Sequence, residues 1–111
     1  MAATWTVYCH THAETGRHYV GITSGTMESR WAQHVRRSMK FAGRSYFQRE
    51  LARLGPGSFS HRVLASGLTQ RQAMEEEAAQ ILRLRAAERD RGFNTRPEKV
   101  RSRKPSFRDL F

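Results

Sequence analysis

Two short runs of aromatic and β-branched residues near the N-terminus constrain the fold of this chain most strongly. They span about residues 5–10 and 17–22, with Tyr8 in the first run and Tyr19 in the second. The segment between them is polar, contains Gly16 and has the composition of a turn. Two such runs flanking a turn are typical of a β-hairpin, so we predict a pair of antiparallel strands that carry one tyrosine each.

Strand alternation predicts which side chains share a face of this hairpin. The first strand places Tyr8 and His10 on one face, and the second strand places Tyr19 and Gly21 together. We therefore expect His10 to border any site that the tyrosines form. The run of residues 9–12, Cys-His-Thr-His, is a weak candidate for a transition-metal site because it contains a single cysteine.

Capping signals and hydrophobic periodicity predict three helices after the hairpin. The first is capped by Ser24 or Thr26, and it combines an apolar stripe with an adjoining polar stripe. The apolar stripe is Met27, Trp31 and Val35, and the polar stripe is Arg30, His34 and Arg37. The other two helices begin at capping boxes, which are Ser45 with Gln48 and Thr69 with Gln72. The second helix stops at the Gly-Pro-Gly of residues 55–57, and the last runs to about residue 87.

Residues 59–64 complete the pattern as a third strand, which gives the order β-β-α-α-β-α. This order predicts an α+β fold, a small three-stranded antiparallel sheet flanked by three helices. Residues 1–95 form the predicted domain. Residues 96–111 are basic and contain two prolines, so we expect a tail or extended arm.

The formal net charge of +10 and the pI of about 11.2 indicate a polyanionic partner, with nucleic acid as the first candidate and an anionic membrane surface as the second. No apolar run approaches the ~18 residues of a membrane span. Cys9 is the single cysteine, so the chain can form no internal disulfide. The N-terminus also lacks the features of a secretion signal. We expect an intracellular, cytoplasmic protein.

Glu77 is an anomaly in the last predicted helix. It falls on the same stripe as Met74, Ala78 and Ile81, so it should lie on the face that packs against the sheet. A carboxylate in that position requires a partner, because an unpaired buried charge is costly. An arginine in an ion pair or a bound metal ion could fill this role.

Five elements of the sequence together resemble the GIY-YIG nuclease domain, in order and in spacing, over residues 5–95. They are Thr6-Val7-Tyr8, Tyr19-Val20-Gly21, Arg30-x-x-x-His34, Glu77 and Gly92-Phe93-Asn94. The first motif departs from the family name at Thr6 and Val7, and the second has Val20 in place of isoleucine. None of these positions is one that the family uses for chemistry.

The resemblance implies a Mg²⁺-dependent endonuclease that hydrolyses phosphodiester bonds of DNA, with Mn²⁺ as a substitute ion. Glu77 would ligate the metal, and Arg30 would contact the scissile phosphate. Tyr8 would be the general base, which requires its pKa to fall below the usual value of ~10. Cationic charge from Arg30 or the metal, or a hydrogen bond from Tyr19 or His34, could lower it.

The remaining positions of the family carry supporting roles. His34 would position Tyr8 or relay its proton. Gly21 would allow the backbone to approach the site closely. Asn94 would fix its loop and orient Glu77 or neighbouring groups. These three residues and the four above make up the expected active site.

Basic residues in the two middle helices and their link are expected to bind the DNA backbone. They are Arg36, Arg37, Lys40, Arg44 and Arg49. Among the interspersed aromatic residues, Phe47 is expected in the core, whereas Phe41 and Tyr46 could pack or stack on bases. The substrate could be single- or double-stranded. Specificity would come from the nuclease domain itself, the basic tail, a second copy of the chain or a partner protein.

Two further interpretations remain open at this level. The chain could be a non-catalytic nucleic-acid-binding module of the same fold, although a binding module has no need of Glu77 on a packing face. It could instead be a structural protein whose basic tail docks on an acidic subunit, which explains the charge but not the set of tyrosine, arginine, histidine and glutamate residues.

Overall fold

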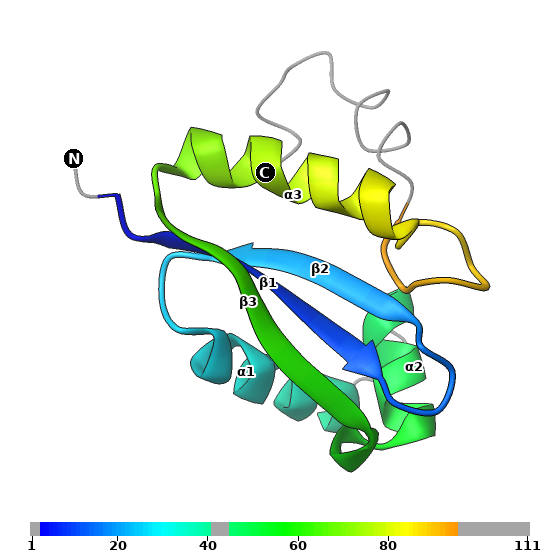
Figure 1. Cartoon of the computed structure of the whole chain (residues 1–111). Helices are drawn as coiled ribbons and strands as arrows, with labels where there is room; N and C mark the ends of the chain where they lie inside the picture. The colour runs from blue at the N-terminus through cyan, green and yellow to red at the C-terminus, as the bar shows by residue number, and fades with distance from the viewer. Residues whose placement is uncertain (1–2, 41–44, 96–111) are drawn as a thin grey trace.

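The computed structural model describes residues 3–40 and 45–95, which form one sheet with helices on both of its faces (Figure 1). The sheet has strand order β2-β1-β3, and both pairings are antiparallel. In chain order the elements are β1 (Trp5–His12), β2 (His18–Thr23), α1 (Met27–Lys40), α2 (Tyr46–Leu54), the 3-10 turn η1 (Pro56–Ser58), β3 (Phe59–Leu68) and α3 (Gln70–Leu84). Within the described residues, no helix has the length and apolar character needed to cross a bilayer.

This architecture confirms the predicted α+β fold and the order β-β-α-α-β-α. The strands differ from prediction mainly in length, because β1 continues to His12 and β3 continues to Leu68. The predicted end of the last helix near residue 87 is wrong. Arg85 adopts the left-handed conformation and ends α3 at Leu84, with its backbone N–H bonded to carbonyl groups of the last turn. The predicted tail, residues 96–111, lies outside the described residues.

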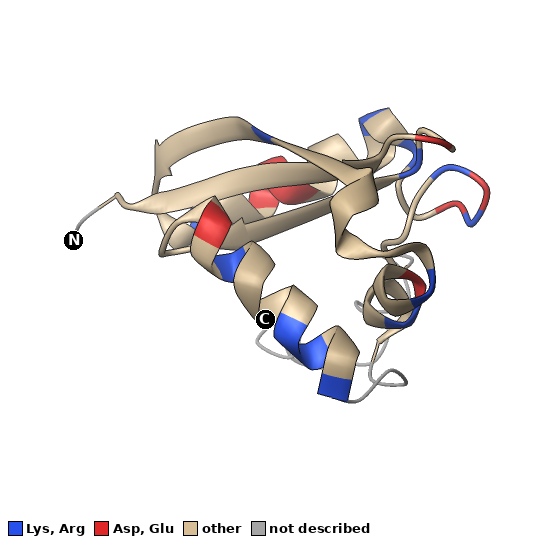
Figure 2. Ribbon diagram, turned by 90° about the horizontal axis from the view of Figure 1, so that it is seen from below, with Lys and Arg blue, Asp and Glu red and all other residues tan. Residues whose placement is uncertain are grey.

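Two hydrophobic cores lie on the two faces of the sheet, with α3 over one face and α1 and α2 over the other (Figure 1). Val7, Cys9 and Val20 pack on the α3 side, as strand alternation predicts. The core on the opposite side is aromatic. It is built on Phe47, Leu51, Phe59 and Phe93, with Tyr19, Trp31 and Val35 packed against it. The view from below in Figure 2 shows the basic residues of α1 along this side of the molecule.

The interior of the α1–α2 layer is more polar than the sequence pattern suggested. His34 is 3% exposed and lies deeper than Trp31 and Val35, which the pattern placed on the packing stripe of α1. In α2, Ser45 caps the helix by accepting a hydrogen bond from the backbone N–H of Gln48. The capping box predicted at Gln48 is not completed, because its side chain turns to His34 instead. The capping box at Thr69 and Gln72 is formed as predicted.

The segment that follows α3 returns to the sheet and lies beside β2. The backbone N–H of His18 donates to the carbonyl of Arg91 at 3.0 Å, and the backbone N–H of Phe93 donates to the carbonyl of His18 at 2.9 Å. His18 and Gly92 thereby form a short parallel bridge. This bridge places Asn94 next to the strand that carries Tyr19.

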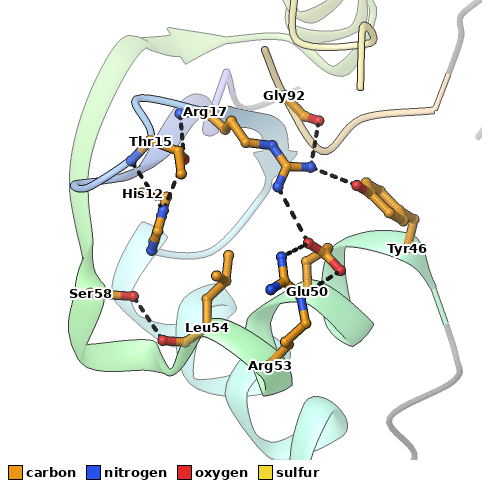
Figure 3. A network of polar contacts seen from close by, with 9 residues as sticks. All are labelled: His12, Thr15, Arg17, Tyr46, Glu50, Arg53, Leu54, Ser58 and Gly92. Carbon is orange, nitrogen blue, oxygen red and sulfur yellow. Dashed lines mark hydrogen bonds and ion pairs between the residues drawn. The ribbon is translucent and has the colours of Figure 1, made fainter. Parts of the chain in front are cut away.

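A buried arginine at the end of the hairpin turn joins three segments of the fold (Figure 3). Arg17 pairs with Glu50 of α2 at 3.3 Å and donates to the hydroxyl oxygen of Tyr46 at 2.6 Å. It also donates to the carbonyl of Gly92 at 3.5 Å, and its guanidinium lies 4.2 Å from the ring centroid of Phe93. The side chains of Arg17 and Glu50 are only 11% and 15% exposed. Arg17 therefore holds the hairpin, α2 and the segment after α3 together.

We predict that Glu50→Ala lowers the free energy of unfolding by about 3 kcal/mol, because the variant leaves the buried charge of Arg17 without its carboxylate. Urea denaturation measures this change. The matched control is Glu75→Ala, which breaks the exposed Arg71–Glu75 pair and should cost less than about 0.5 kcal/mol. Equal losses in the two variants would contradict a central role for the Arg17 network.

Candidate active site

Tyr8 lies directly opposite Gly21 in the pairing of β1 with β2. A Cβ atom added to Gly21 would overlap the hydroxyl oxygen and Cζ of Tyr8, and it would lie 2.9 Å from Cε1. The phenol of Tyr8 therefore crosses β2 in space that only a glycine leaves free. Tyr8 is 1% exposed, so its ring is fixed by packing on all sides.

The second tyrosine faces the same layer from β2. Tyr19 is paired with His10 across the strands, and its ring stacks on Phe47 of α2 with centroids 4.0 Å apart and planes at 4°. His34 meets the ring of Tyr19 edge-on, with centroids 5.4 Å apart. The aromatic core of this layer thus holds Tyr19 beside the residue that contacts Tyr8.

Helix α1 contributes Arg30 and His34 on one stripe, as their i, i+4 spacing predicted. Nε2 of His34 lies 3.4 Å from the hydroxyl oxygen of Tyr8. The charge of the Arg30 guanidinium lowers the pKa of the same phenol, and Arg30 also donates to Oε1 of Gln33. Both predicted residues of α1 therefore converge on Tyr8.

Asn94 is buried and forms two hydrogen bonds with the backbone of Val20. Its Oδ1 accepts from the N–H at 2.8 Å, and its Nδ2 donates to the carbonyl at 2.9 Å. Val20 lies between Tyr19 and Gly21, so this amide fixes the part of β2 that carries both. The contact of Asn94 is with β2, whereas the resemblance suggested that it orients Glu77 or its neighbours.

Glu77 of α3 is within electrostatic range of both phenols, because its charge raises the pKa of Tyr8 and of Tyr19. Within residues 3–40 and 45–95, it has no hydrogen bond and no ion pair. Burial raises the pKa of Glu77 from its usual 4.5 to about 7. The ion pair with an arginine, one of the two partners considered for this carboxylate, is therefore not made in the described part of the chain.

The carboxylate of Glu77 is a hard oxygen ligand, which suits a cation held by a single protein carboxylate. The described residues contain no group of three or more histidine, cysteine, aspartate or glutamate side chains able to hold a metal ion, so the run at residues 9–12 forms no such site. A cation at Glu77 would take its other ligands from water and phosphate oxygens, as Mg²⁺ commonly does. The residues present fit that ion.

Burial controls the protonation of the other groups in the site. It raises the pKa of Tyr8 to about 12 and outweighs the opposing effect of Arg30, so the protein alone does not supply the depressed pKa that a general base requires. The pKa of Tyr19 is also raised. Burial, with the nearby charges of Arg30 and Arg37, lowers the pKa of His34 to about 4. The two tyrosines and His34 are thus neutral at pH 7.

His10 borders the site as expected, with its ring centroid 4.8 Å from that of Tyr8. Its Nδ1 lies 2.9 Å from Nδ1 of His61 on β3, and Trp31 packs on both imidazole rings with centroids 4.5 Å away. Burial lowers the pKa of His10 to about 3, so this ring remains neutral. No sequence motif points to His61, because its place opposite His10 depends on the register of β3.

The residues expected to bind nucleic acid fall into three groups. Arg36, Arg37 and Lys40 are exposed on the C-terminal half of α1, where Figure 2 shows several blue segments of the ribbon. These three residues are called the α1 basic band below. Arg49 is exposed on α2, whereas Arg44 lies outside the described residues. Within the described part of the chain, Arg36, Arg37 and Lys40 form no ion pair with a carboxylate.

The aromatic residues among these basic residues differ in their surroundings. Phe47 is 3% exposed and belongs to the core, as expected. Tyr46 accepts a hydrogen bond from Arg17, and the guanidinium of Arg89 lies 3.7 Å from its ring centroid, so protein groups already engage it. Phe41 lies outside the described residues.

Comparison with solved structures supports the fold. Two similar solved structures are described as a mutant of the catalytic domain of intron endonuclease I-TevI and the catalytic domain of homing endonuclease I-TevI. The first has a TM-score of 0.70 and 20% sequence identity, and the alignment covers 86% of this chain and 95% of that chain. The second has a TM-score of 0.69 and 21% identity, with coverage of 83% and 98%.

No curated protein sequence matches this chain. Residues 4–91, well over half of its length, match the GIY-YIG catalytic domain. The chain belongs to the GIY-YIG nuclease family.

Proposed function

We propose that this protein is a metal-dependent endonuclease that hydrolyses phosphodiester bonds of DNA. The observation that carries this proposal is the carboxylate of Glu77, which is half-buried without a protein partner in the described residues and lies within electrostatic range of Tyr8 and Tyr19. Membership of a nuclease family supports it, and so does the similarity to two catalytic domains described as endonucleases.

Glu77 is the residue that would hold the metal, with Mg²⁺ as the proposed ion and Mn²⁺ as a substitute. A bound cation would stabilise negative charge on the leaving 3′ oxygen and lower the pKa of Tyr8. Glu77 must be ionised to bind it, and a carboxyl with a pKa of about 7 loses its proton readily at neutral pH.

Arg30 is proposed to bind the scissile phosphate. Its planar fork can donate to two phosphate oxygens at once, and its charge opposes the growth of negative charge during attack. Because Arg30 acts on the phenol of Tyr8, a phosphate bound to Arg30 would lie next to that phenol. Binding and orientation of the reacting group therefore depend on the same side chain.

Tyr8 is proposed as the general base that accepts the proton of the attacking water. Hydrogen bonds from Arg30 and from His34 would stabilise the phenolate that this step requires. Tyr19 supports the arrangement by packing against His34, and Asn94 holds β2 in place. Their roles are to position groups rather than to react.

The α1 basic band is proposed to guide the DNA backbone to Arg30, with Arg44 and Arg49 extending the path. Phosphate neutralisation by such residues gives salt-dependent binding. One site per chain makes a cut in one strand the unit of activity. Double-strand cleavage, and specificity for a sequence, would need a second copy or a partner protein. We place this activity inside the cell, where DNA is available.

A non-catalytic nucleic-acid-binding module is the second candidate. The observation in its favour is the pKa of Tyr8, which burial moves to about 12, the direction opposite to that of a general base. The observation against it is Glu77, because a binding module gains nothing from a half-buried carboxylate without a partner. Cleavage assays separate the two candidates.

We predict that the protein cleaves labelled DNA in the presence of Mg²⁺ and that EDTA abolishes this activity. Single- and double-stranded substrates of the same sequence, tested in parallel, identify the preferred form. Glu77→Ala should reduce the cleavage rate by about 10³-fold or more, because it removes the metal ligand.

The control for the cleavage assay is Glu75→Ala, which removes an exposed carboxylate from the same helix and should cleave at the wild-type rate. Salt-sensitive DNA binding without cleavage by the folded wild type would instead support the non-catalytic module.

We predict that Glu77→Gln stabilises the protein at high pH when metal is removed by a chelator. The folded-state pKa of Glu77 is above its unfolded value, so the stability it contributes is fully present below pH 4.5 and is lost as pH rises through 7. Glutamine does not ionise, so it keeps that stability. The difference in unfolding free energy should grow to about 2 kcal/mol at pH 8.5, allowing for partial exposure of the side chain.

Urea denaturation of both proteins at pH 5 and pH 8.5 measures this difference and cancels the histidine contributions, which both share. Excess Mg²⁺ at pH 8.5 should raise the stability of the wild type but not of Glu77→Gln. A difference that stays constant between the two pH values would argue against a raised pKa at Glu77.

We predict that replacing Arg36 and Lys40 with glutamine weakens DNA binding and reduces its salt dependence. The slope of log K against log salt concentration should decrease by about 0.7 to 0.9 for each phosphate that the variant no longer neutralises. Fluorescence anisotropy with labelled DNA measures both quantities. The matched control replaces Arg71 and Arg83 of α3, which removes the same charge from the opposite side of the sheet and should leave the slope closer to that of the wild type.

A further inference from the structure

Gln48 occupies a position in α2 that its capping role does not explain. It is 6% exposed, and its backbone N–H donates a hydrogen bond to the side-chain oxygen of Ser45, which caps the helix. The side chain points inward, and Nε2 lies 3.5 Å from Nδ1 of His34 on the neighbouring helix. A buried amide directed at an imidazole nitrogen constrains where that imidazole can carry its proton.

The two nitrogens of His34 face different partners. Nδ1 faces the amide of Gln48, and Nε2 faces the hydroxyl oxygen of Tyr8 at 3.4 Å. A neutral imidazole has one N–H and one bare nitrogen, and an amide NH₂ group can only donate. When Gln48 donates to Nδ1, the single proton of His34 must be on Nε2, where it points to Tyr8.

The surroundings of His34 keep its imidazole neutral, so the ring carries a single proton. Arg30 and Arg37 of α1 are the charged groups whose effect on His34 is resolved, and both oppose an imidazolium. The rings that meet it from the sheet are Tyr19 and His10, besides Tyr8. In the described residues no carboxylate pairs with His34. Burial is the main cause of its lowered pKa, and the charges of Arg30 and Arg37 act in the same direction.

We propose that Gln48 is a positioning residue that fixes His34 as the Nε2–H tautomer, so that His34 donates a hydrogen bond to the oxygen of Tyr8. The effect of this tautomer on catalysis rests on the proposed nuclease function. A donor at Nε2 stabilises the phenolate of Tyr8, whereas the opposite tautomer would offer a lone pair to a negatively charged oxygen. His34 therefore assists Tyr8 as a hydrogen-bond donor and does not take its proton.

The first test is the tautomer itself, measured by ¹⁵N NMR of the imidazole nitrogens in the folded, metal-free wild type at pH 7. The His34 signal is assigned by its loss in His34→Asn. We expect a protonated Nε2 and a bare Nδ1. A protonated Nδ1 in the wild type would overturn the proposal, and this result does not depend on whether the protein cleaves DNA.

Two variants then connect the tautomer to activity. Gln48→Glu presents an acceptor to Nδ1, so ¹⁵N NMR should show a proton on that nitrogen. Gln48→Met removes the hydrogen bond and should lower kcat by about tenfold with KM unchanged, the effect of one hydrogen bond. Circular dichroism and the remaining NMR signals establish that both variants are folded.

The control variant is Gln70→Met, which replaces an exposed glutamine at the start of α3 and should leave kcat and the His34 signals unchanged. A Gln48→Glu protein that keeps the Nε2–H tautomer, or a Gln48→Met protein with wild-type kcat, would refute the positioning role. If the wild type fails to cleave DNA while its His34 is in the Nε2–H tautomer, the geometric inference holds and the proposed function fails.

Discussion

The pairing register of β1 with β2 determines how the residues that these two strands contribute to the candidate site are arranged. It places Tyr8 opposite Gly21 and His10 opposite Tyr19. Because side chains alternate along a strand, a slip of one residue would transfer Tyr8 to the face covered by α3. The apolar residues of the opposite face prevent such a slip, since it would move them out of their core. Asn94 adds a second restraint by bonding both backbone groups of Val20. Residues that perform no chemistry thus hold the two phenols in place.

The parts of the fold that depend on local pattern were predictable, and the parts that depend on packing partners were not. Alternation predicted that Tyr8 and His10 share a face, and the helical repeat predicted that Arg30 and His34 share a stripe. In contrast, the two capping-box signals are identical in form, yet only the one at Thr69 is completed. Gln72 is exposed and free to fold back on its own helix, whereas Gln48 faces α1 and bonds to His34.

The role of Arg17 was also hidden from the sequence, for a related reason. In the sequence it is a residue at the end of a turn and the start of the second strand, where an arginine side chain is expected to be solvated. Its partners Glu50 and Gly92 are far away in sequence and are brought to it only when α2 and the segment after α3 pack on the hairpin. The lack of an ion pair at Glu77 in the described residues was hidden for the same reason. It depends on how the helices pack, which determines whether an arginine comes close to this carboxylate. Sequence pattern identifies the unusual carboxylate, and only the packed structure tells whether a protein group neutralises it.

Under the proposed function, helix α1 would link substrate binding to the chemistry, because its two sets of polar residues differ in direction but share one rigid axis. Arg30 and His34 point to Tyr8, while Arg36, Arg37 and Lys40 are exposed at the other end of the helix. Arg30 and Arg37 are seven residues apart, about 10 Å along the axis, which is close to three base steps of B-form DNA. A backbone phosphate bound at the exposed end would therefore fix the register of the strand relative to Arg30. Under the proposed function, helix geometry determines which phosphate lies at Arg30 to be cut. Burial keeps Tyr8 and His34 uncharged and raises the pKa of Glu77, and a bound phosphate and cation would oppose these effects.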